Sequence, residues 1–268
     1  MRDLGIEFIS VFGLPPVEFV HLAADLGCLY ISTGLIGRPL ESLGYPAFSL
    51  NEDARLRRDL LAAMDDCGVS ISLGEGMLIT PESDVSERAA DLDVMTELGA
   101  AQVNTVSFDP DRNRTFDQLA MLTEMAAERG IGTTIEMAPG MTIGDPAAVV
   151  AAMEHVGRPE LRLTVDTMHW ARCGYGAAEL RELGPEKIGY VQLSDTPLKP
   201  RIKPYLEEAM YERMAPGDGE LPLAEMLGAV PNDVVVGLEI PMRRLAEAGV
   251  GPMERLRPCV AAARELLR

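Results

Sequence analysis

Short apolar runs alternate with longer amphipathic runs along the whole chain. The short runs are rich in β-branched residues, which favours strands, and the longer runs carry the spacing of apolar residues that is typical of helices. This alternation predicts βα units and a parallel sheet. The predicted strands are residues 4–11, 28–35, 69–73, 102–108, 131–137, 161–166, 187–194 and 234–240.

A helix is predicted after each strand. Eight units in 268 residues are about 33 residues each, which fits a single (β/α)8 TIM barrel over residues 1–268. Two doubly wound halves would alternate in the same way, but no Gly/Pro/Ser-rich linker divides the chain. Glycines after helices, which favour a left-handed C-cap, are Gly27, Gly68, Gly99 and Gly130. The predicted helices are residues 15–26, 53–67, 86–98, 116–129, 146–155, 177–183, 223–227 and 253–267.

Polar residues end four consecutive apolar strands, the fifth to the eighth. In (β/α)8 barrels the functional residues lie at the carboxyl ends of the strands, where the βα loops surround one cavity. Successive side chains on a strand face opposite sides, so each end residue shares its inward face with the residue two positions earlier. The four residues are Glu136 after TTI, Asp166 after LTV, Gln192 after YV and Glu239 after VVVGL.

Three carboxylates and an amide oxygen in one cavity predict a divalent metal site. The carboxylates would repel each other unless a cation neutralised them. Ligation by oxygen alone favours Mg²⁺ or Mn²⁺, with Co²⁺ and Zn²⁺ as less favoured alternatives. The alternative interpretation is that acidic strand ends simply face water at the barrel mouth.

Five segments of the second half resemble the xylose-isomerase-like barrel superfamily, and among its members they are most similar to the branch that contains hydroxypyruvate isomerase. The stretch FGLPP…AADLG (12–27) is also similar. The resemblance implies that Glu136, Asp166, Gln192 and Glu239 bind the metal. The segments are TIEMAP (134–139), VDTMHW (165–170), YVQLSDTP (190–197), ERMAPGDGELPL (212–223) and GLEIP (237–241).

The chain departs from these relatives at several positions. Many relatives have histidine where this chain has Gln192, whereas the hydroxypyruvate-isomerase branch has glutamine. The acidic residue that is common on the second strand of relatives is absent, and residues 31–33, Ile-Ser-Thr, stand there. Segment 198–211 is longer than the corresponding loop of hydroxypyruvate isomerase. Only three histidines and a pI near 4.6 argue against the zinc-rich endonuclease IV branch.

The resemblance implies a metal-dependent isomerase or epimerase of carbohydrate metabolism, acting on a small keto-sugar or hydroxy-keto acid. A metal that chelates the ketone and the neighbouring hydroxyl stabilises the enediolate formed when the intervening C–H loses its proton. Glu136 and Glu239 are the expected acid–base pair. A lyase or dehydratase similar to dehydroshikimate dehydratase, and a non-catalytic binding barrel, are the alternatives.

Five further residues are candidates for substrate binding. His169, three positions after Asp166, either polarises a substrate oxygen or serves as a structural donor. Arg213 pairs with a substrate carboxylate or hydroxyl, or else forms surface ion pairs with nearby glutamates. Glu75 lines the pocket or lies in a solvated loop, Asn104 contacts the substrate or the core, and Trp170 forms an apolar wall or packs internally. Asp195 has the opposite parity to Gln192 and is expected behind the ligands.

The net charge of −18 disfavours nucleic acid and anionic membranes as partners. The chain has no apolar stretch long enough to span a bilayer and no signal-peptide pattern at its N-terminus, and its four cysteines are scattered without CxxC spacing. We therefore expect a cytoplasmic protein with reduced thiols and a small-molecule substrate. Related barrels often form homodimers.

Overall fold

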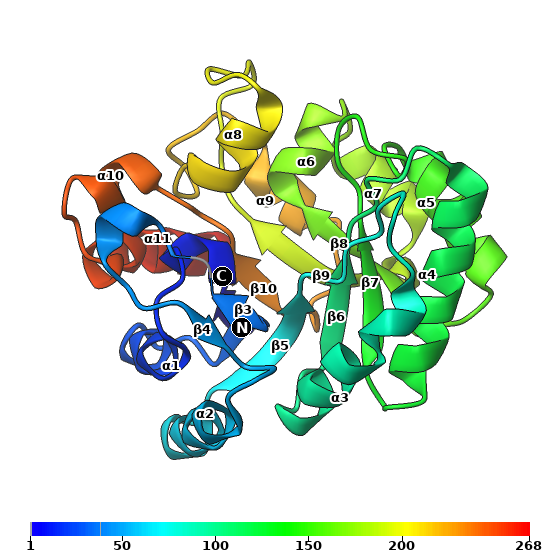
Figure 1. Ribbon diagram of the computed structural model, residues 1–268. Coiled ribbons are helices and arrows are strands. Elements are labelled where there is room, and N and C mark those ends of the chain that lie inside the picture. Colours follow the sequence, from blue (N-terminus) through cyan, green and yellow to red (C-terminus); the bar gives the residue numbers. More distant parts are fainter. Residues whose placement is uncertain (1, 38) are drawn as a thin grey trace.

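A closed barrel of eight parallel strands occupies the centre of the computed structural model, which describes residues 2–37 and 39–268 (Figure 1). Around the barrel the strands follow the order β1-β10-β9-β8-β7-β6-β5-β2, which confirms the predicted (β/α)8 TIM barrel. The strands are β1 (Leu4–Ile6), β2 (Tyr30–Gly34), β5 (Ser70–Glu75), β6 (Gln102–Thr105), β7 (Gly132–Glu136), β8 (Leu161–Asp166), β9 (Ile188–Leu193) and β10 (Val236–Leu238).

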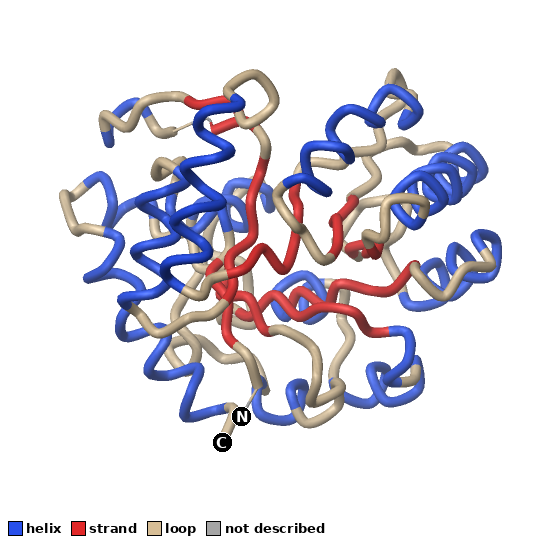
Figure 2. The backbone as a smooth tube through the Cα atoms, turned by 90° about the horizontal axis from the view of Figure 1, so that it is seen from below, coloured by secondary structure: helices blue, strands red, loops and turns tan. Residues whose placement is uncertain are grey.

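Helices surround the barrel (Figure 2). The short antiparallel pair β3 (Ile36–Gly37) and β4 (Phe48–Ser49) lies outside it and was not predicted. The helices are α1 (Pro16–Asp25), α2 (Ala54–Cys67), α3 (Ala89–Glu97), α4 (Arg112–Ala127), α5 (Pro146–Val156), α6 (Thr167–Arg172), α7 (Ala177–Leu183), α8 (Tyr205–Tyr211), α9 (Leu223–Leu227), α10 (Arg243–Glu247) and α11 (Pro252–Leu266).

The glycine signals behave as predicted. Gly27, Gly68, Gly99 and Gly130 all have positive φ, between 65° and 73°. In this conformation an L side chain is strained, whereas glycine allows the chain to leave each helix and turn toward the next strand.

The first strand is shorter than the predicted 4–11. It ends at Ile6, and Phe8–Val11 forms a 3-10 turn that leads to Phe12 in a left-handed conformation. The hydroxyl of Ser10 donates to the carbonyl of Leu238 and accepts from the amide of Ile240, so a side chain replaces the backbone ladder between these segments. The chain therefore leaves the sheet directly after Glu7, whose side chain lies inside the barrel.

The core lies between the barrel and the helices. Ile135, Leu163, Val165, Leu193 and Leu238 are all buried, as their outward parity predicts. Burying one such side chain contributes about 1.5–3 kcal/mol, so this layer fixes which residues of each strand are left to face the barrel interior.

Candidate active site

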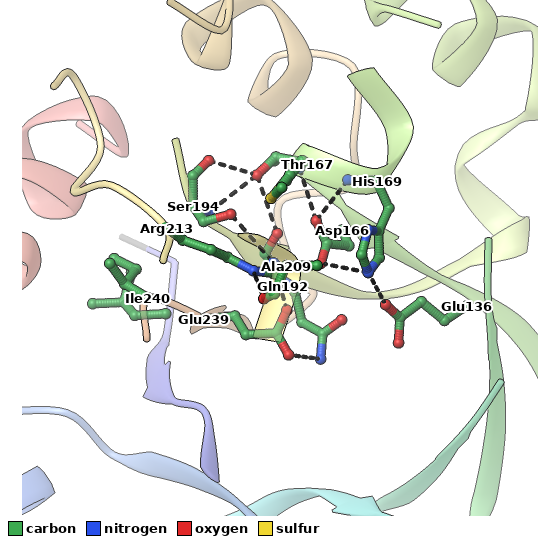
Figure 3. Close-up of polar contacts among 12 residues, drawn as sticks. Glu136, Asp166, Thr167, His169, Gln192, Ser194, Ala209, Arg213, Glu239 and Ile240 are labelled. Atoms are coloured by element: carbon green, nitrogen blue, oxygen red, sulfur yellow. Dashed lines mark hydrogen bonds and ion pairs between the residues drawn. The ribbon is translucent and has the colours of Figure 1, made fainter. Parts of the chain in front are cut away.

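The four predicted ligand residues lie at the carboxyl ends of neighbouring strands. Glu136 ends β7, Asp166 ends β8, Gln192 lies one residue before the end of β9, and Glu239 directly follows β10. All four side chains are buried. Figure 3 shows Asp166 and Gln192 between Glu136 on one side and Glu239 on the other. The register explains this arrangement, because Asp166 is paired with Gln192 across the β8–β9 ladder.

Asn104 on β6 holds Glu136 in place. Its amide nitrogen donates to Oε2 of Glu136 at 2.7 Å, and its amide oxygen accepts from the hydroxyls of Thr134 and Thr164, each at 3.0 Å. The two threonines thus face the interior, as their parity predicts. Its amide is thus engaged with protein groups and orients the carboxylate, while contact of Asn104 with a substrate stays a prediction.

Arg213 forms two buried ion pairs with the predicted ligands. Its Nη1 lies 2.5 Å from Oδ2 of Asp166 and 2.7 Å from Oε2 of Glu239. The alternative of a surface ion pair for Arg213 is therefore wrong, since the side chain is only 4% exposed. The nearby glutamates pair elsewhere, Glu207 with Arg243 and Glu208 with Arg172.

The positive charge of Arg213 affects the pKa values of Asp166 and Glu239 differently. Burial alone would raise the pKa of Asp166, but the attraction of Arg213, followed by a contribution from His169, holds it well below the usual aspartate value. Burial raises the pKa of Glu239 well above the usual glutamate value, because the attraction of Arg213 is smaller than the desolvation cost. Arg213 thus outweighs the desolvation of Asp166 and only partly offsets that of Glu239.

The P-G-D-G turn that follows Arg213 positions its backbone. Asp195, after β9, accepts from the amides of Gly217 and Leu221, and a Cβ on Gly219 would lie 2.2 Å from its Oδ1. The backbone of Asp195 also exchanges two hydrogen bonds with Met214. Segment 213–220, R-M-A-P-G-D-G-E, thus forms a turn that docks on Asp195 and directs Arg213 into the barrel. This agrees with the placement of Asp195 behind the ligands.

Asp166 also determines the position of His169. Its Oδ1 accepts from the backbone amides of Met168 and His169 and so caps the short helix α6. Nε2 of His169 lies 3.1 Å from Oε1 of Glu136 and 3.5 Å from Oδ2 of Asp166. Its other ring nitrogen contacts the hydroxyl of Tyr205 on α8. The ring is therefore oriented from both sides.

Glu7, which was not among the predicted site residues, lies inside the barrel beneath the site. It accepts a hydrogen bond from the hydroxyl of Tyr190 at 2.7 Å and is fully buried. Burial raises its pKa. Burial and then repulsion by Glu7 and Glu136 raise the pKa of Glu75. The strand-end rule could have identified Glu7 from the sequence, because Glu7 follows the apolar strand Leu-Gly-Ile as the other carboxylates follow their strands.

Gly237 makes room for Glu7. A Cβ built at this glycine would lie 1.6 Å from Oε1 of Glu7 and 2.7 Å from the hydroxyl of Tyr190. Gly237 therefore faces the interior, as predicted from its shared parity with Glu239. Above this layer the amide nitrogen of Gln192 donates to Glu239 at 3.2 Å and to Glu75 at 3.4 Å.

Trp170 does not lie at the pocket, so the expectation that it forms a wall for the substrate is corrected. Its indole N–H donates to the carbonyl of Gly176, and its ring packs against Tyr175 at a centroid distance of 5.8 Å. The side chain is buried. Because α6 presents His169 to the site, the next residue points away into the core.

The chemistry of the donor set fits a divalent cation. Glu136, Asp166 and His169 each offer a ligand atom, and these atoms all lie within 4.8 Å of one another. Oε1 of Gln192 is buried and accepts no hydrogen bond from the residues that the structure describes. Glu239 is not part of this close group, and its Oε2 is paired with Arg213. The close group thus contains His169, which was predicted to contact the substrate.

A pocket of about 540 Å³ opens above this cluster. Its floor includes Glu75, Glu136, His169, Arg213 and Glu239, whereas Asp166 lies deeper. Glu75 therefore lines the pocket and does not lie in a solvated loop. A volume of this size is in the range of small-molecule sites.

Within residues 2–37 and 39–268, no helix combines the length and the apolar character that crossing a membrane requires. None of the four cysteines forms a disulfide bond. Cys28 and Cys259 are buried, and Cys67 and Cys173 are half-buried.

Most of the chain matches one protein family. Residues 20–262 match the family model of the xylose isomerase-like TIM barrel. A curated 3-dehydroshikimate dehydratase of Pseudomonas putida is 29% identical over 153 residues, which make up 55% of this chain and 24% of that enzyme. The match thus spans about a quarter of the length of this relative.

Solved structures share the fold at low sequence identity. The IolI protein with a bound zinc atom has a TM-score of 0.80 and 18% identity, and the alignment covers 100% of this chain and 98% of IolI. D-psicose 3-epimerase in the presence of D-fructose has a TM-score of 0.71 and 16% identity, with 100% and 99% of the two chains covered. At these identities, both similarities show a shared fold only.

Proposed function

The chain belongs to the xylose isomerase-like TIM barrel family, and from this premise we propose that it is a metal-dependent isomerase or epimerase. Its substrate is a small compound in which a hydroxyl group neighbours a carbonyl group, an arrangement shared by keto-sugars and hydroxy-keto acids. The reaction moves a proton at the carbon next to the carbonyl.

The observation that supports this proposal most directly is the placement of two glutamates on either side of the cluster (Figure 3). Glu136 and Glu239 both line the pocket, and the strands β8 and β9 separate them around the barrel. One carboxylate can remove a proton from one face of a substrate carbon while the other returns a proton to the opposite face. Asn104 orients Glu136, and Gln192 and Arg213 orient Glu239.

The residues that would hold the metal are Glu136 and Asp166, which form the close group with His169, and Gln192, whose buried Oε1 is without a partner among the described residues. Glu239, which lies outside the close group, is the further predicted ligand. A bound divalent ion supplies Lewis-acid stabilisation of the negative charge that develops on the carbonyl oxygen. Arg213 supplies a fixed positive charge at the same place. His169, held by Tyr205, can donate a hydrogen bond to a substrate oxygen in the pocket.

Deuterium incorporation tests the proposal. The Mn²⁺-loaded protein is incubated in D₂O with a panel of hydroxyketones, and NMR follows deuterium at the carbon next to the carbonyl. Glu239→Gln and Glu136→Gln should each reduce exchange by about 10²–10⁴-fold, because a positioned carboxylate contributes about this factor to proton transfer. Glu225→Gln, on the exposed surface of α9, is the matched control.

Full activity of Glu239→Gln would remove this residue from the acid–base pair. A protein that binds no divalent ion and catalyses no exchange would contradict the proposal and favour a binding barrel. Asp166→Ala should also reduce the metal content of the purified protein, and unchanged content would contradict its role as a ligand.

A dehydratase is the second candidate, and the similarity to the Pseudomonas putida enzyme favours it. The same proton removal would then be followed by loss of a hydroxyl from the neighbouring carbon. Mass spectrometry separates the two reactions, because an isomerase leaves the mass of the substrate unchanged in H₂O and a dehydratase lowers it by one water.

A further inference from the structure

The walls of the pocket are apolar, in contrast to its charged floor. Among the described residues, nine large hydrophobic side chains are exposed, and five of them line this one pocket. Clusters of exposed apolar side chains on a soluble protein mark binding surfaces, whereas isolated ones need no explanation. The five are Ile36, Leu78, Phe108, Leu206 and Met210.

These side chains come from separate connections of the barrel. Ile36 lies on β3, Leu78 follows β5, and Phe108 follows β6, while Leu206 and Met210 lie on α8. Segments far apart in the sequence thus supply apolar atoms to the same cavity. Phe8, which follows β1, adds a further aromatic side chain.

Within residues 2–37 and 39–268, the walls offer few hydrogen-bonding groups to a substrate. Apart from the charged floor, the polar side chains of these described residues that line the pocket are Asn51, Arg88 and Asp91. These bond to one another: Asn51 donates to Oδ1 of Asp91 at 2.9 Å, and Arg88 pairs with Oδ2 at 3.1 Å. A substrate with many hydroxyls would lose its water contacts in this cavity without gaining equivalent partners.

We propose that the substrate joins a hydroxy-carbonyl head to an apolar body, such as an aromatic ring or a hydrocarbon chain, and that the body packs against the pocket walls. The head lies on the floor formed by Glu136, His169 and Glu239, so this inference rests on the proposed function for the head and extends it for the body. A small molecule fits better than a protein partner, because the apolar side chains enclose a cavity that is continuous with the carboxylate floor.

Two hydroxyketones with the same head and different bodies test the proposal. The probes are 1-hydroxy-4-phenylbutan-2-one and the polyhydroxylated erythrulose, each titrated calorimetrically into the Mn²⁺-loaded protein. We expect the phenyl compound to bind at least tenfold more tightly. Equal affinities, or tighter binding of erythrulose, would overturn the proposal.

Met210→Gln should reduce the affinity for the phenyl compound several-fold more than the affinity for erythrulose. Met121→Gln is the control, because Met121 is exposed to a similar extent, 39% against 42%, but lies on α4 and does not line the pocket. The control should leave both affinities unchanged. Thermal unfolding of both variants checks that the fold is retained. A Met210→Gln protein that retains the full preference would contradict the assignment of the body to these walls.

The compound 4-phenylbutan-2-one, which lacks the hydroxyl of the head, separates failure of this inference from failure of the proposed function. If it binds while neither hydroxyketone exchanges its proton, the proposed function fails and the apolar pocket stands. If no phenyl compound binds, the inference fails.

Sedimentation tests whether the apolar side chains instead contact a second copy of the chain. A dimer that dissociates in Met210→Gln, with ligand affinities unchanged, would show such a contact and would also overturn the proposal.

Discussion

The buried guanidinium of Arg213 neutralises part of a dense negative cluster. Asp166 and Glu239 are both buried, and both oxygens that face Arg213 lie within 2.7 Å of its Nη1. Removing one member of a buried ion pair leaves an uncompensated charge in the interior, which costs far more than the loss of a surface pair. Arg213 therefore contributes to stability as well as to the arrangement of the site.

Arg213→Met is expected to lower the free energy of unfolding by about 3–5 kcal/mol when metal is removed with EDTA. Chemical denaturation followed by circular dichroism measures this change. The control is Arg243→Met, because Arg243 forms a partly exposed pair with Glu207, and its loss should cost at most about 1 kcal/mol.

Saturating Mn²⁺ should restore more stability to Arg213→Met than it adds to the natural protein, since a cation replaces the missing charge. Equal stabilisation of both proteins by Mn²⁺ would count against a metal at this cluster.

Single residues were predicted from the sequence where a simple pattern located them. The strand-end rule and side-chain parity found Glu136, Asp166, Gln192 and Glu239 and placed them at one mouth. The rule could not identify the partners of these residues, because Arg213 and Asn104 reach the cluster from other elements and their contacts depend on tertiary packing. Their roles in a reaction stay predictions.

At the scale of elements, the interior of the barrel is shaped by which strands carry small residues. Gly237 on β10 faces Glu7, and the strands β1 and β10 pair through Gly5 and Gly237. A side chain at position 237 would occupy space that the Glu7 carboxylate already fills. Close packing of the barrel layers is therefore specified by a glycine in one strand and a carboxylate in its neighbour.

Gly237→Ala should destabilise the protein by about 1–3 kcal/mol, because the added methyl group overpacks a closed interior. Glu7→Ala combined with Gly237→Ala should cost less than the sum of the two single changes, since loss of the Glu7 carboxylate vacates the space that the methyl group added at position 237 needs. Urea unfolding of the three variants measures the coupling. Strict additivity would indicate that the strands shift apart and the two residues do not compete for space.

Elements with strong periodicity were predicted well, whereas several short ones, namely β3, β4, α6, α8 and α10, were missed. The eight barrel strands and the glycine-terminated helices follow from patterns of apolar residues over many positions. The helix α6 has six residues and depends on the Asp166 side chain as its cap, and α8 follows a segment rich in Pro and Lys. Such elements form because the rest of the barrel provides their partners, so a local pattern does not reveal them.

At the scale of the whole molecule, the net charge of −18 makes the folded state repel itself. Salt screens this repulsion, and the Debye length falls from about 30 Å at 0.01 M to about 3 Å at 1 M. The charge argued against nucleic acid as a partner, and that remains a prediction. Its effect on stability is measurable.

Raising NaCl from 0.01 M to 0.5 M should increase the midpoint of thermal unfolding, because the compact state concentrates the negative charges more than the unfolded chain does. Differential scanning calorimetry at constant pH in the presence of EDTA measures the midpoint. A decrease with salt would show that attractive surface ion pairs outweigh the net repulsion.

The closure of the barrel by β1 and β10 has a consequence for the order in which the site is assembled during synthesis. A nascent chain that has emerged as far as residue 230 already carries Glu136, Asp166, Gln192 and Arg213, but Arg213 lacks its second carboxylate and β1 has an unpaired edge. Only the emergence of β10 brings Glu239 and covers that edge. The cluster is therefore completed late, by the same strand that seals the sheet, so a ribosome-bound chain carries an incomplete cluster until β10 docks.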